Sequence, residues 1–186
     1  KTDYNLRAPS GRNPKDFWNY SGSDYAGTWK KRGKGQPFFT VYNIGESHES
    51  RAFGDHKDES VDPKKMILAP YHPDLPEMRN TYAKYASAIS KMDSLVGQAI
   101  ENLKQDGLYE DTIIVYNSDH GGVLARSKRF LYSSGIHCPL IVRIPEKWKH
   151  LYPKGKSPGS TIDRIVSFID MPKTWVSLTG AEMKNN

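Results

Sequence analysis

The sequence predicts an α/β fold, in which a mainly parallel sheet is flanked by helices and forms part of a larger domain. Apolar runs rich in β-branched and aromatic residues at 37–45, 112–117 and 138–144 indicate buried strands. A stretch of helical periodicity at 78–103 separates the first two runs. Strands that alternate with helices usually build parallel sheets, so the pattern favours this fold class.

Composition bounds the class of protein. The chain has 186 residues, 37% of them hydrophobic, enough for one core or for part of a larger domain. Its net charge of +6 favours anionic partners such as sulfated or phosphorylated molecules, although an ordinary basic surface explains it equally well. No nucleic-acid motif accompanies the charge, and no apolar run is long enough to span a membrane. Cys138 is the only cysteine, which excludes an internal disulfide and a thiolate zinc cluster, and we expect an inert thiol there.

The first strand lies between two irregular stretches. Residues 1–36 are polar and predict an irregular segment, so the α/β core is expected over 37–180. The run 37–45 predicts a buried strand, and the densely charged stretch 46–62 predicts the loop that leaves it. Prolines recur through 63–76 and predict an extended connector to the helix.

The clearest predicted helix covers 78–103. Its apolar side chains recur at spacings of three and four residues and form one stripe. The members of the stripe are Met78, Tyr82, Tyr85, Ile89, Met92, Val96, Ile100 and Leu103. Pro76 suits the first turn of this helix, and Gly107 suits the residue just past its end. We expect the stripe to pack in the core rather than to contact a cofactor.

The C-terminal elements complete the pattern. Pro145 stops the strand predicted at 138–144. The run 162–169 is largely apolar and β-branched, as in a further strand. Asp170 is expected to cap a short helix that has Pro172 in its first turn and Gly180 just past its end.

The pair Asp119-His120 is the most informative feature of the chain. It follows the predicted strand 112–117, and Gly121-Gly122 then allows a tight turn. In open α/β sheets, ligands and metals gather at the carboxyl ends of the strands. A polar turn after a strand is the competing interpretation.

Two further clusters are expected to lie at the same edge of the sheet. Residues 46–51, which include His48, follow the first strand, and the basic group Arg126, Lys128 and Arg129 follows the glycine pair. A carboxylate with oxygen or imidazole donors can hold a divalent cation. Lys and His can neutralise an oxyanion and protonate a leaving group. The residues therefore indicate metal-assisted hydrolysis of a phosphate or sulfate ester and do not decide between the two.

Several segments, taken in order, resemble the type I sulfatases of the alkaline phosphatase superfamily, and most closely the heparan N-sulfatase-like branch. The segment with Asp119 and His120 and the following Lys128 resemble a metal- and sulfate-binding block, and the stretch with His48 resembles the block with an active-site histidine. The matching segments are 45–51, 68–71, 73–79, 85–97, 117–122, 128–132, 139–143, 167–172 and 178–180.

The resemblance implies a fold and roles for individual residues. The fold is an alkaline phosphatase- and sulfatase-like α/β domain, of which the chain is an internal to C-terminal part. Asp119 and His120 are implied as ligands of a calcium ion. Lys128 is implied to contact the sulfate, and His48 to contact the sulfate or assist the leaving group. Lys1 and Asp3 match a block whose lysine and histidine line the pocket.

The nucleophile of the family is missing from the sequence. Type I sulfatases use a formylglycine made within a Cys/Ser-x-Pro-Ser-Arg motif, and this chain has none: Cys138 is followed by Pro139-Leu140. The first metal-binding Asp pair is also missing. We therefore expect formylglycine and the remaining ligands upstream of Lys1, and we expect the isolated chain to be inactive.

The resemblance implies a calcium-dependent sulfatase that hydrolyses sulfate esters or N-sulfate groups of sulfated, glycosaminoglycan-type sugars. Two alternatives remain open: a phosphoesterase or phosphonate hydrolase of the same superfamily, and a non-catalytic fragment or pseudoenzyme that binds anionic glycans. The family implies a periplasmic, secreted or lysosomal location. The sequence leaves the oligomeric state open.

Overall fold

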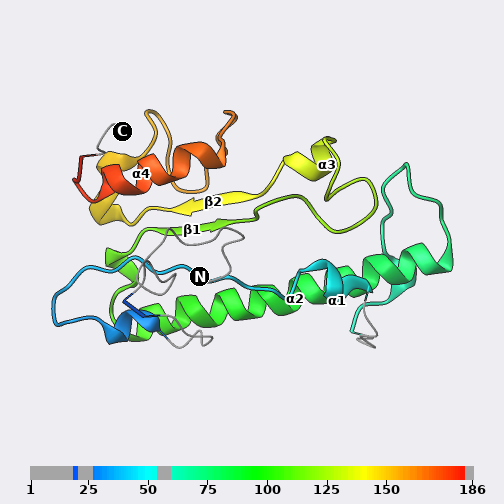
Figure 1. Cartoon of the computed structure of the whole chain (residues 1–186), viewed down its shortest axis with the longest axis horizontal. Helices are drawn as coiled ribbons and strands as arrows, with labels where there is room; N and C mark the ends of the chain where they lie inside the picture. Colours follow the sequence, from blue (N-terminus) through cyan, green and yellow to red (C-terminus); the bar gives the residue numbers. More distant parts are fainter. Residues whose placement is uncertain (1–18, 21–26, 54–59, 183–186) are drawn as a thin grey trace, which may run out of the picture. The chain divides into compact units, whose positions relative to one another are not determined.

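The structure, a computed structural model, describes residues 19–20, 27–53 and 60–182 (Figure 1). The chain divides into two compact units, Lys1–Lys149 and His150–Asn186, which are treated separately below. The α-helices and strands are α1 (Glu49–Phe53), α2 (Pro76–Gln105), β1 (Ile114–Asn117), α3 (Ser133–Ile136), β2 (Leu140–Arg143) and α4 (Met171–Leu178). Short 3-10 turns lie at Thr28–Lys31, Pro63–Lys65, Tyr109–Asp111, Glu146–Leu151 and Phe168–Asp170.

Helix α2 is the long element of the first unit, and it agrees with the sequence prediction. Pro76 lies in its first turn, where a missing backbone N–H costs nothing. The helix ends at Gln105, and Gly107, just past its end, has a φ of 68° and donates from its N–H to the Lys104 carbonyl at 2.9 Å. Within the predicted stripe, Leu103 is buried and six other members are half-buried, as expected of a helix face that packs inward, whereas Ile89 is exposed. Among the described helices, none is both long and apolar enough to cross a membrane.

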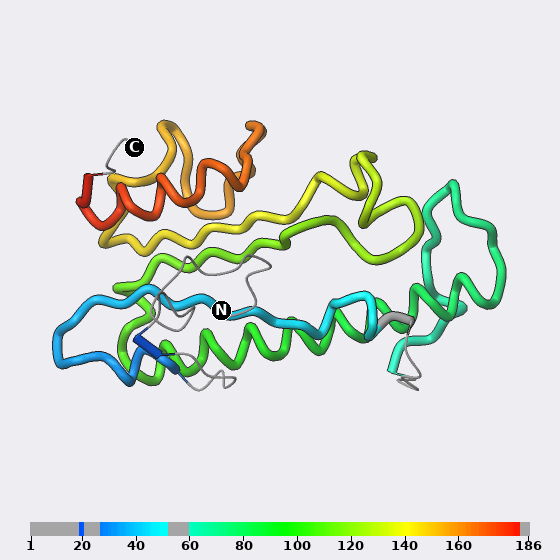
Figure 2. The backbone as a smooth tube through the Cα atoms, in the orientation of Figure 1, coloured from blue at the N-terminus to red at the C-terminus, as the bar shows by residue number. Residues whose placement is uncertain are grey.

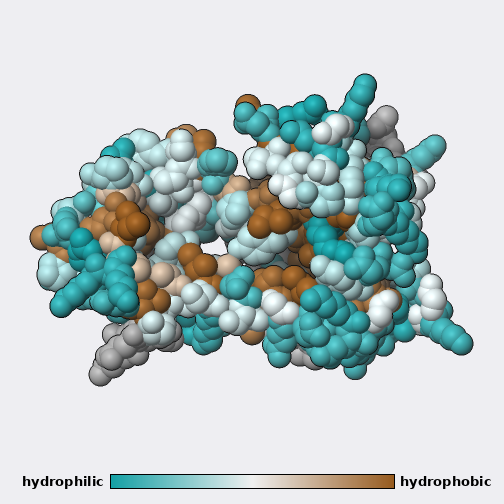
Figure 3. Space-filling view, turned by 180° about the vertical axis from the view of Figure 1, so that it is seen from behind, coloured by the Kyte–Doolittle hydropathy of each residue, from teal (hydrophilic) through white to brown (hydrophobic). Residues whose placement is uncertain are grey.

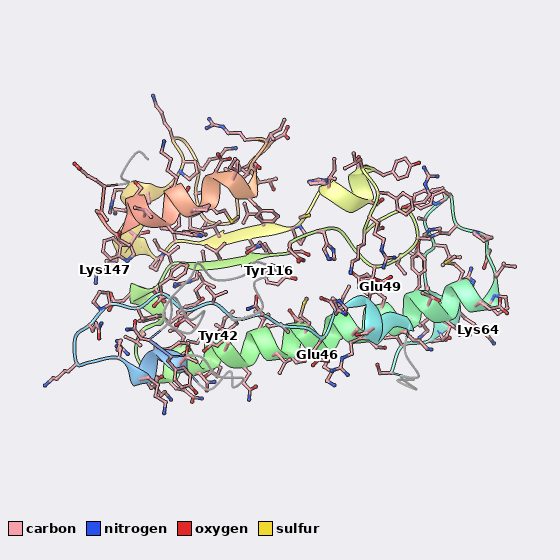
Figure 4. The ribbon with its side chains drawn as sticks, in the orientation of Figure 1. Tyr42, Glu46, Glu49, Lys64, Tyr116 and Lys147 are labelled. Carbon is pink, nitrogen blue, oxygen red and sulfur yellow. The ribbon has the colours of Figure 1, made fainter. Side chains whose placement is uncertain are left out.

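The two strands of the first unit pair with each other. In the antiparallel register, Ile114 lies opposite Arg143 and Asn117 lies opposite Leu140. The hydroxyl of Tyr116, on β1, donates to the sulfur of Met92, on α2, at 3.7 Å. This contact holds the strand pair against the helix, and Figure 4 labels Tyr116.

The orientation of this pair differs from the expected one. The positions of both strands match the predictions, but the described strands do not confirm a mainly parallel sheet. The physical reason lies in the connection. Past the last paired residues, the Ser118 N–H donates to the Pro139 carbonyl at 3.3 Å, so the chain folds back on itself as a continued hairpin instead of crossing over.

The segment 37–45 is extended, but it is not the buried strand that the sequence predicted. No described strand pairs with it, and Phe39 is 59% exposed. A strand requires a hydrogen-bonded neighbour, and the apolar pattern of one segment cannot supply it. The segment instead runs alongside α2 (Figure 2). Its course is fixed at one end by a tilted contact of the Trp29 and Phe38 rings, whose centroids lie 5.8 Å apart, and at the other by an ion pair between Glu46 and Lys91 at 3.7 Å.

Trp29 closes the core at the C-terminal end of α2. Its ring is 4% exposed, and its indole N–H donates to Asp106 Oδ2 at 2.7 Å. This hydrogen bond, followed by that from Lys30, lowers the pKa of Asp106 below its ordinary value. Trp29 and Lys30 are therefore joined to the C-terminal cap of the long helix by a hydrogen bond and an ion pair.

The second unit contains α4 and the segment before it. Pro172 and Gly180 occupy the predicted positions at the two ends of the helix. Asp170 does not cap α4 with its side chain; it instead accepts a hydrogen bond from the Ser167 N–H at 3.2 Å. The run 162–169 forms no strand, because its apolar side chains have no neighbouring strand among the described residues, and Ile169 is 82% exposed. Hydrophobic residues, coloured brown, are also exposed on the face of the molecule that Figure 3 shows.

Candidate active site

The candidate site is built on the loop between β1 and α3. The Gly121 N–H donates to the Gly135 carbonyl at 2.8 Å and closes this loop at its base. A Cβ at Gly121 would lie 1.9 Å from the Ser134 carbonyl oxygen, and a Cβ at Gly135 would lie 2.1 Å from that of Phe130. Neither glycine has a positive φ. Both glycines therefore allow a close approach of backbone to backbone that a side chain would prevent.

Helix α2 supports this loop from one side. A Cβ at Gly122 would lie 3.0 Å from the Tyr85 hydroxyl, so the tyrosine packs directly against the loop. Burial, followed by the charge of Tyr116, raises the pKa of Tyr85 above its ordinary value. The Gly122 carbonyl accepts a hydrogen bond from the Lys128 N–H at 2.8 Å. The backbone of Lys128 is therefore fixed by the same turn that carries the glycine pair.

Asp119 and His120 lie at the start of the loop between β1 and α3. The Asp119 side chain is 86% exposed, and its Oδ1 lies 3.7 Å from His120 Nε2. His120 Nδ1 lies 2.7 Å from the Gly121 carbonyl oxygen, which can only accept, so this nitrogen carries the proton. In the neutral ring, Nε2 then keeps a lone pair. This is the tautomer that a metal ligand requires when its other nitrogen is hydrogen-bonded to a carbonyl.

Glu49, the first residue of α1, joins this helix to the loop after β1. Its Oε2 lies 3.3 Å from Lys128 Nζ and 2.8 Å from an Arg129 guanidinium nitrogen (Figure 4). The side chains of Glu49 and Lys128 are each 22% exposed. One carboxylate therefore holds two cations of the basic group.

The sequence interpretation assigned no role to Glu49. Its position next to His48 and the excess of cations at 126–129 were the only signals in the sequence. Partial desolvation raises the pKa of Glu49, but the hydrogen bond from Lys128 and the charges of Arg129 and Lys128 outweigh it, so the net pKa lies below its ordinary value. The carboxylate is therefore held in its charged form.

His48 lies immediately before α1. The Ser50 N–H donates to His48 Nδ1 at 3.3 Å, and the Ser50 hydroxyl lies 3.0 Å from the same nitrogen. Because Nδ1 accepts, the proton of the neutral ring is on Nε2, which can donate to an anion. Glu49, the next residue, makes the ion pair with Lys128.

The predicted site residues do not all fall within the described part of the chain. Lys1 and Asp3 lie outside it. Within the described ranges, no group of three or more His, Cys, Asp or Glu side chains could hold a metal ion. Asp119 and His120 therefore supply only part of a coordination shell, since Ca²⁺ takes six to eight oxygen ligands.

Cys138 is consistent with the predicted inert thiol. Burial, followed by the negative charge of Asp119, raises the pKa of its thiol above the ordinary value. The thiolate, which is the reactive form, is therefore less populated than in a free cysteine.

Arg126 is held between two tyrosine rings beside Lys128. Its guanidinium carbon lies 4.7 Å from the centroid of the Tyr71 ring and 4.4 Å from that of Tyr132. The backbone of Arg126 is left-handed, with a φ of 62°, a conformation that costs ~1–3 kcal/mol and is concentrated at functional sites. The sequence analysis placed Arg126 in the basic group of the site, but it did not predict the contact with the two rings.

The comparisons with known proteins define the class. The family model described as Sulfatase matches residues 20–181, and the chain therefore belongs to the sulfatase family, with an alkaline phosphatase-like α/β fold. The match supports assignment to the type I sulfatases.

Individual relatives agree with this class. The chain is 32% identical to the "Ulvan-active sulfatase" of Formosa agariphila, over 99% of the chain and 34% of that protein. It is 28% identical to the "N-sulphoglucosamine sulphohydrolase" of Homo sapiens, over 76% of the chain and 27% of that protein. It is 31% identical to the "N-acetylglucosamine-6-O-sulfatase" of Bacteroides thetaiotaomicron, over 55% of the chain and 18% of that protein. The chain thus spans about a third or less of the length of these relatives.

Proposed function

We propose that the protein containing this chain hydrolyses sulfate esters or N-sulfate groups of sulfated sugars. The observation that carries the proposal is the ion pair of Glu49 with Lys128, which holds a lysine ammonium in the loop that also contains Asp119 and His120. Membership of the sulfatase family supports the reaction class. The names of the relatives, which include ulvan and N-sulphoglucosamine, support a sulfated carbohydrate substrate.

In this proposal, Lys128 binds the sulfate group. Its ammonium is partly desolvated, and a charge in such surroundings stabilises a developing oxyanion better than one in water. Glu49 and the backbone hydrogen bond to Gly122 fix its position before substrate binds. The lysine is therefore preorganised for an anion.

His48 is the proposed hydrogen-bond donor to the sulfate or to the leaving oxygen or nitrogen. The contacts from Ser50 leave the proton on Nε2, the nitrogen that points away from the turn's own donors. In this tautomer the Nε2–H group can donate a hydrogen bond to a sulfate oxygen or to the leaving atom.

We propose that Asp119, with His120 beside it, contributes to a calcium site. The exposed carboxylate is a hard oxygen ligand that suits Ca²⁺, and His120 has the tautomer of a ligand, although imidazole suits softer metals better. A bound calcium ion would supply positive charge to the sulfate oxygens. The remaining ligands and the formylglycine nucleophile are proposed to come from a segment outside these 186 residues, and we propose a periplasmic, secreted or lysosomal location.

The test is sulfate release by the intact protein that contains this chain. Chromogenic aryl sulfate, N-sulfoglucosamine and a sulfated oligosaccharide should each be assayed with calcium and with a chelator. Calcium-dependent release from at least one substrate is expected, and no release from residues 1–186 alone. Release of phosphate but not sulfate from matched aryl esters would overturn the proposal in favour of a phosphoesterase. Glycan binding without any hydrolysis would favour a non-catalytic protein.

A further inference from the structure

The stack around Arg126 is fixed from two separate segments. Tyr71 comes from the proline-rich connector, and Tyr132 comes from the loop after β1. His72, next to Tyr71, lies 3.0 Å from the Ala125 carbonyl through Nε2 and 2.7 Å from the Tyr82 hydroxyl through Nδ1. The connector and the loop are thus pinned together beside Arg126.

The contacts of the Arg126 guanidinium with the two rings are cation–π contacts, which use none of its N–H donors. The N–H donors of arginine lie in the plane of the group and form a fork that matches two oxygens of an anion. The residue is exposed, and among the described side chains and backbone groups no acceptor takes a hydrogen bond from this guanidinium. The hydrogen bond of Arg126 itself is made by its carbonyl, which accepts from the Ser134 hydroxyl at 2.5 Å.

Other stacked arginines of the chain behave differently. Arg32 lies 5.4 Å from the Phe38 ring and donates to the carbonyls of Gln36 and Trp29. Arg143 lies 3.5 Å from the Tyr109 ring and donates to both carboxylate oxygens of Glu110. In these two cases the fork is used within the protein. Arg126 likewise lies against aromatic rings, but no described acceptor takes a hydrogen bond from its guanidinium.

We propose that Arg126 binds a second anionic group of the substrate, on the sugar next to the one whose sulfate is held by Lys128. This inference rests on the proposed function and deepens it, because it defines the substrate as a glycan with at least two anionic groups. Arg126 and Lys128 are two residues apart, so their backbones lie within about 7 Å, a span that a disaccharide can bridge. Either a sulfate or a uronate carboxylate presents the paired oxygens that the fork recognises.

The experiment compares substrates with one and two anionic groups in the intact protein. The variants are Arg126→Gln, which removes the charge, Arg126→Lys, which keeps the charge without the fork, and Arg32→Gln as a matched control at a stacked arginine elsewhere. The substrates are an aryl sulfate, a disaccharide with a second sulfate, and a disaccharide with a carboxylate in its place. The two disaccharides distinguish the two sources of the anion.

Arg126→Gln should lower kcat/KM for at least one disaccharide by roughly tenfold to a hundredfold, the scale of a lost charge-assisted hydrogen bond. The same variant should lower kcat/KM for the aryl sulfate far less. Arg126→Lys should recover part of the difference, and Arg32→Gln should leave both rates unchanged. Equal proportional losses on all substrates, which a purely structural clamp predicts, would overturn the inference, and so would no loss on either disaccharide.

A binding measurement keeps this inference separate from the proposed function. Should the unaltered protein release no sulfate, the proposed function fails, but calorimetric titration with the two disaccharides still tests Arg126. A similar fold-loss of affinity in Arg126→Gln, absent in Arg32→Gln, would support the second anion site. Unchanged affinity for both disaccharides would contradict it.

Discussion

Glu49 and Lys128 form an ion pair at 3.3 Å that joins α1 to the loop after β1, two segments far apart in the sequence. The same carboxylate oxygen also receives Arg129 at 2.8 Å. A single acidic side chain therefore sets the position of the lysine proposed to bind sulfate, and the histidine proposed to assist the leaving group is its immediate neighbour.

Replacing Glu49 with Gln should lower kcat/KM for sulfate release by roughly tenfold, because Lys128 loses its charge-assisted partner and its fixed position. The measurement is steady-state kinetics of the intact protein on an aryl sulfate. Glu110→Gln is the matched control, since Glu110 also pairs with an arginine, Arg143, away from the site. Equal losses in the two variants would refute a specific role for Glu49.

The Glu49 contact should survive mild acid. Its pKa lies below the model-peptide value of 4.5, so the charged form is favoured in the folded protein. The contribution of the pair to stability is therefore fully present above pH ~4.5 and is lost as the pH falls through the lowered folded pKa. Hydrogen exchange of the Lys128 amide, followed from pH 7 downwards, should show protection until below pH 4.5. Loss of protection already at pH 6 would contradict this.

Replacing Gly121 with Ala should destabilise the protein by ~1–3 kcal/mol or more. Its new Cβ would lie 1.9 Å from the Ser134 carbonyl oxygen, which is backbone and cannot rotate away. Gly97 is the matched control: it lies within α2 with nothing within 4 Å of a new Cβ, so Gly97→Ala should be neutral or stabilising by up to ~1 kcal/mol. The thermal unfolding midpoints of the two variants and the parent measure these changes. A Gly121→Ala protein as stable as the parent would show that Gly121 does not pack against the Ser134 backbone.

Replacing Asp119 with Asn should weaken calcium binding by the intact protein at least tenfold, because a neutral amide is a poorer ligand for a hard cation. Calorimetric titration with Ca²⁺ measures it directly. Asp111→Asn removes a carboxylate that pairs with Lys147 and should leave the calcium affinity unchanged. An unaltered affinity in Asp119→Asn would remove Asp119 from the metal site.

The sequence predicted those parts of the fold that depend on local patterns. Helix α2 was predictable, with Pro76 in its first turn and Gly107 just past its end, because periodicity and terminal residues are local signals. The positions of β1 and β2 were predictable for the same reason, but their antiparallel pairing depends on hydrogen bonds across the intervening loop. The runs 37–45 and 162–169 have strand composition without a described partner strand, and composition cannot supply one.

The candidate site was predictable only in part. The motif containing Asp119, His120 and Lys128 marked the loop, and the tautomer of His120 then followed from its contact with the Gly121 carbonyl. Glu49 and the stack around Arg126 depend on contacts between distant segments, which a single sequence does not contain. These tertiary contacts determine that Lys128 and Arg129 are paired with Glu49, whereas Arg126 lies against two rings.

Sulfate release by the intact protein and by its Lys128→Ala variant tests the central claim most directly. With N-sulfoglucosamine or an aryl sulfate, in calcium, the parent should release sulfate, and the variant should lose roughly a hundredfold or more in kcat/KM, the scale for removal of one oxyanion-stabilising donor. Equal rates in the two proteins, both correctly folded, would show that the loop between β1 and α3 does not hold the sulfate.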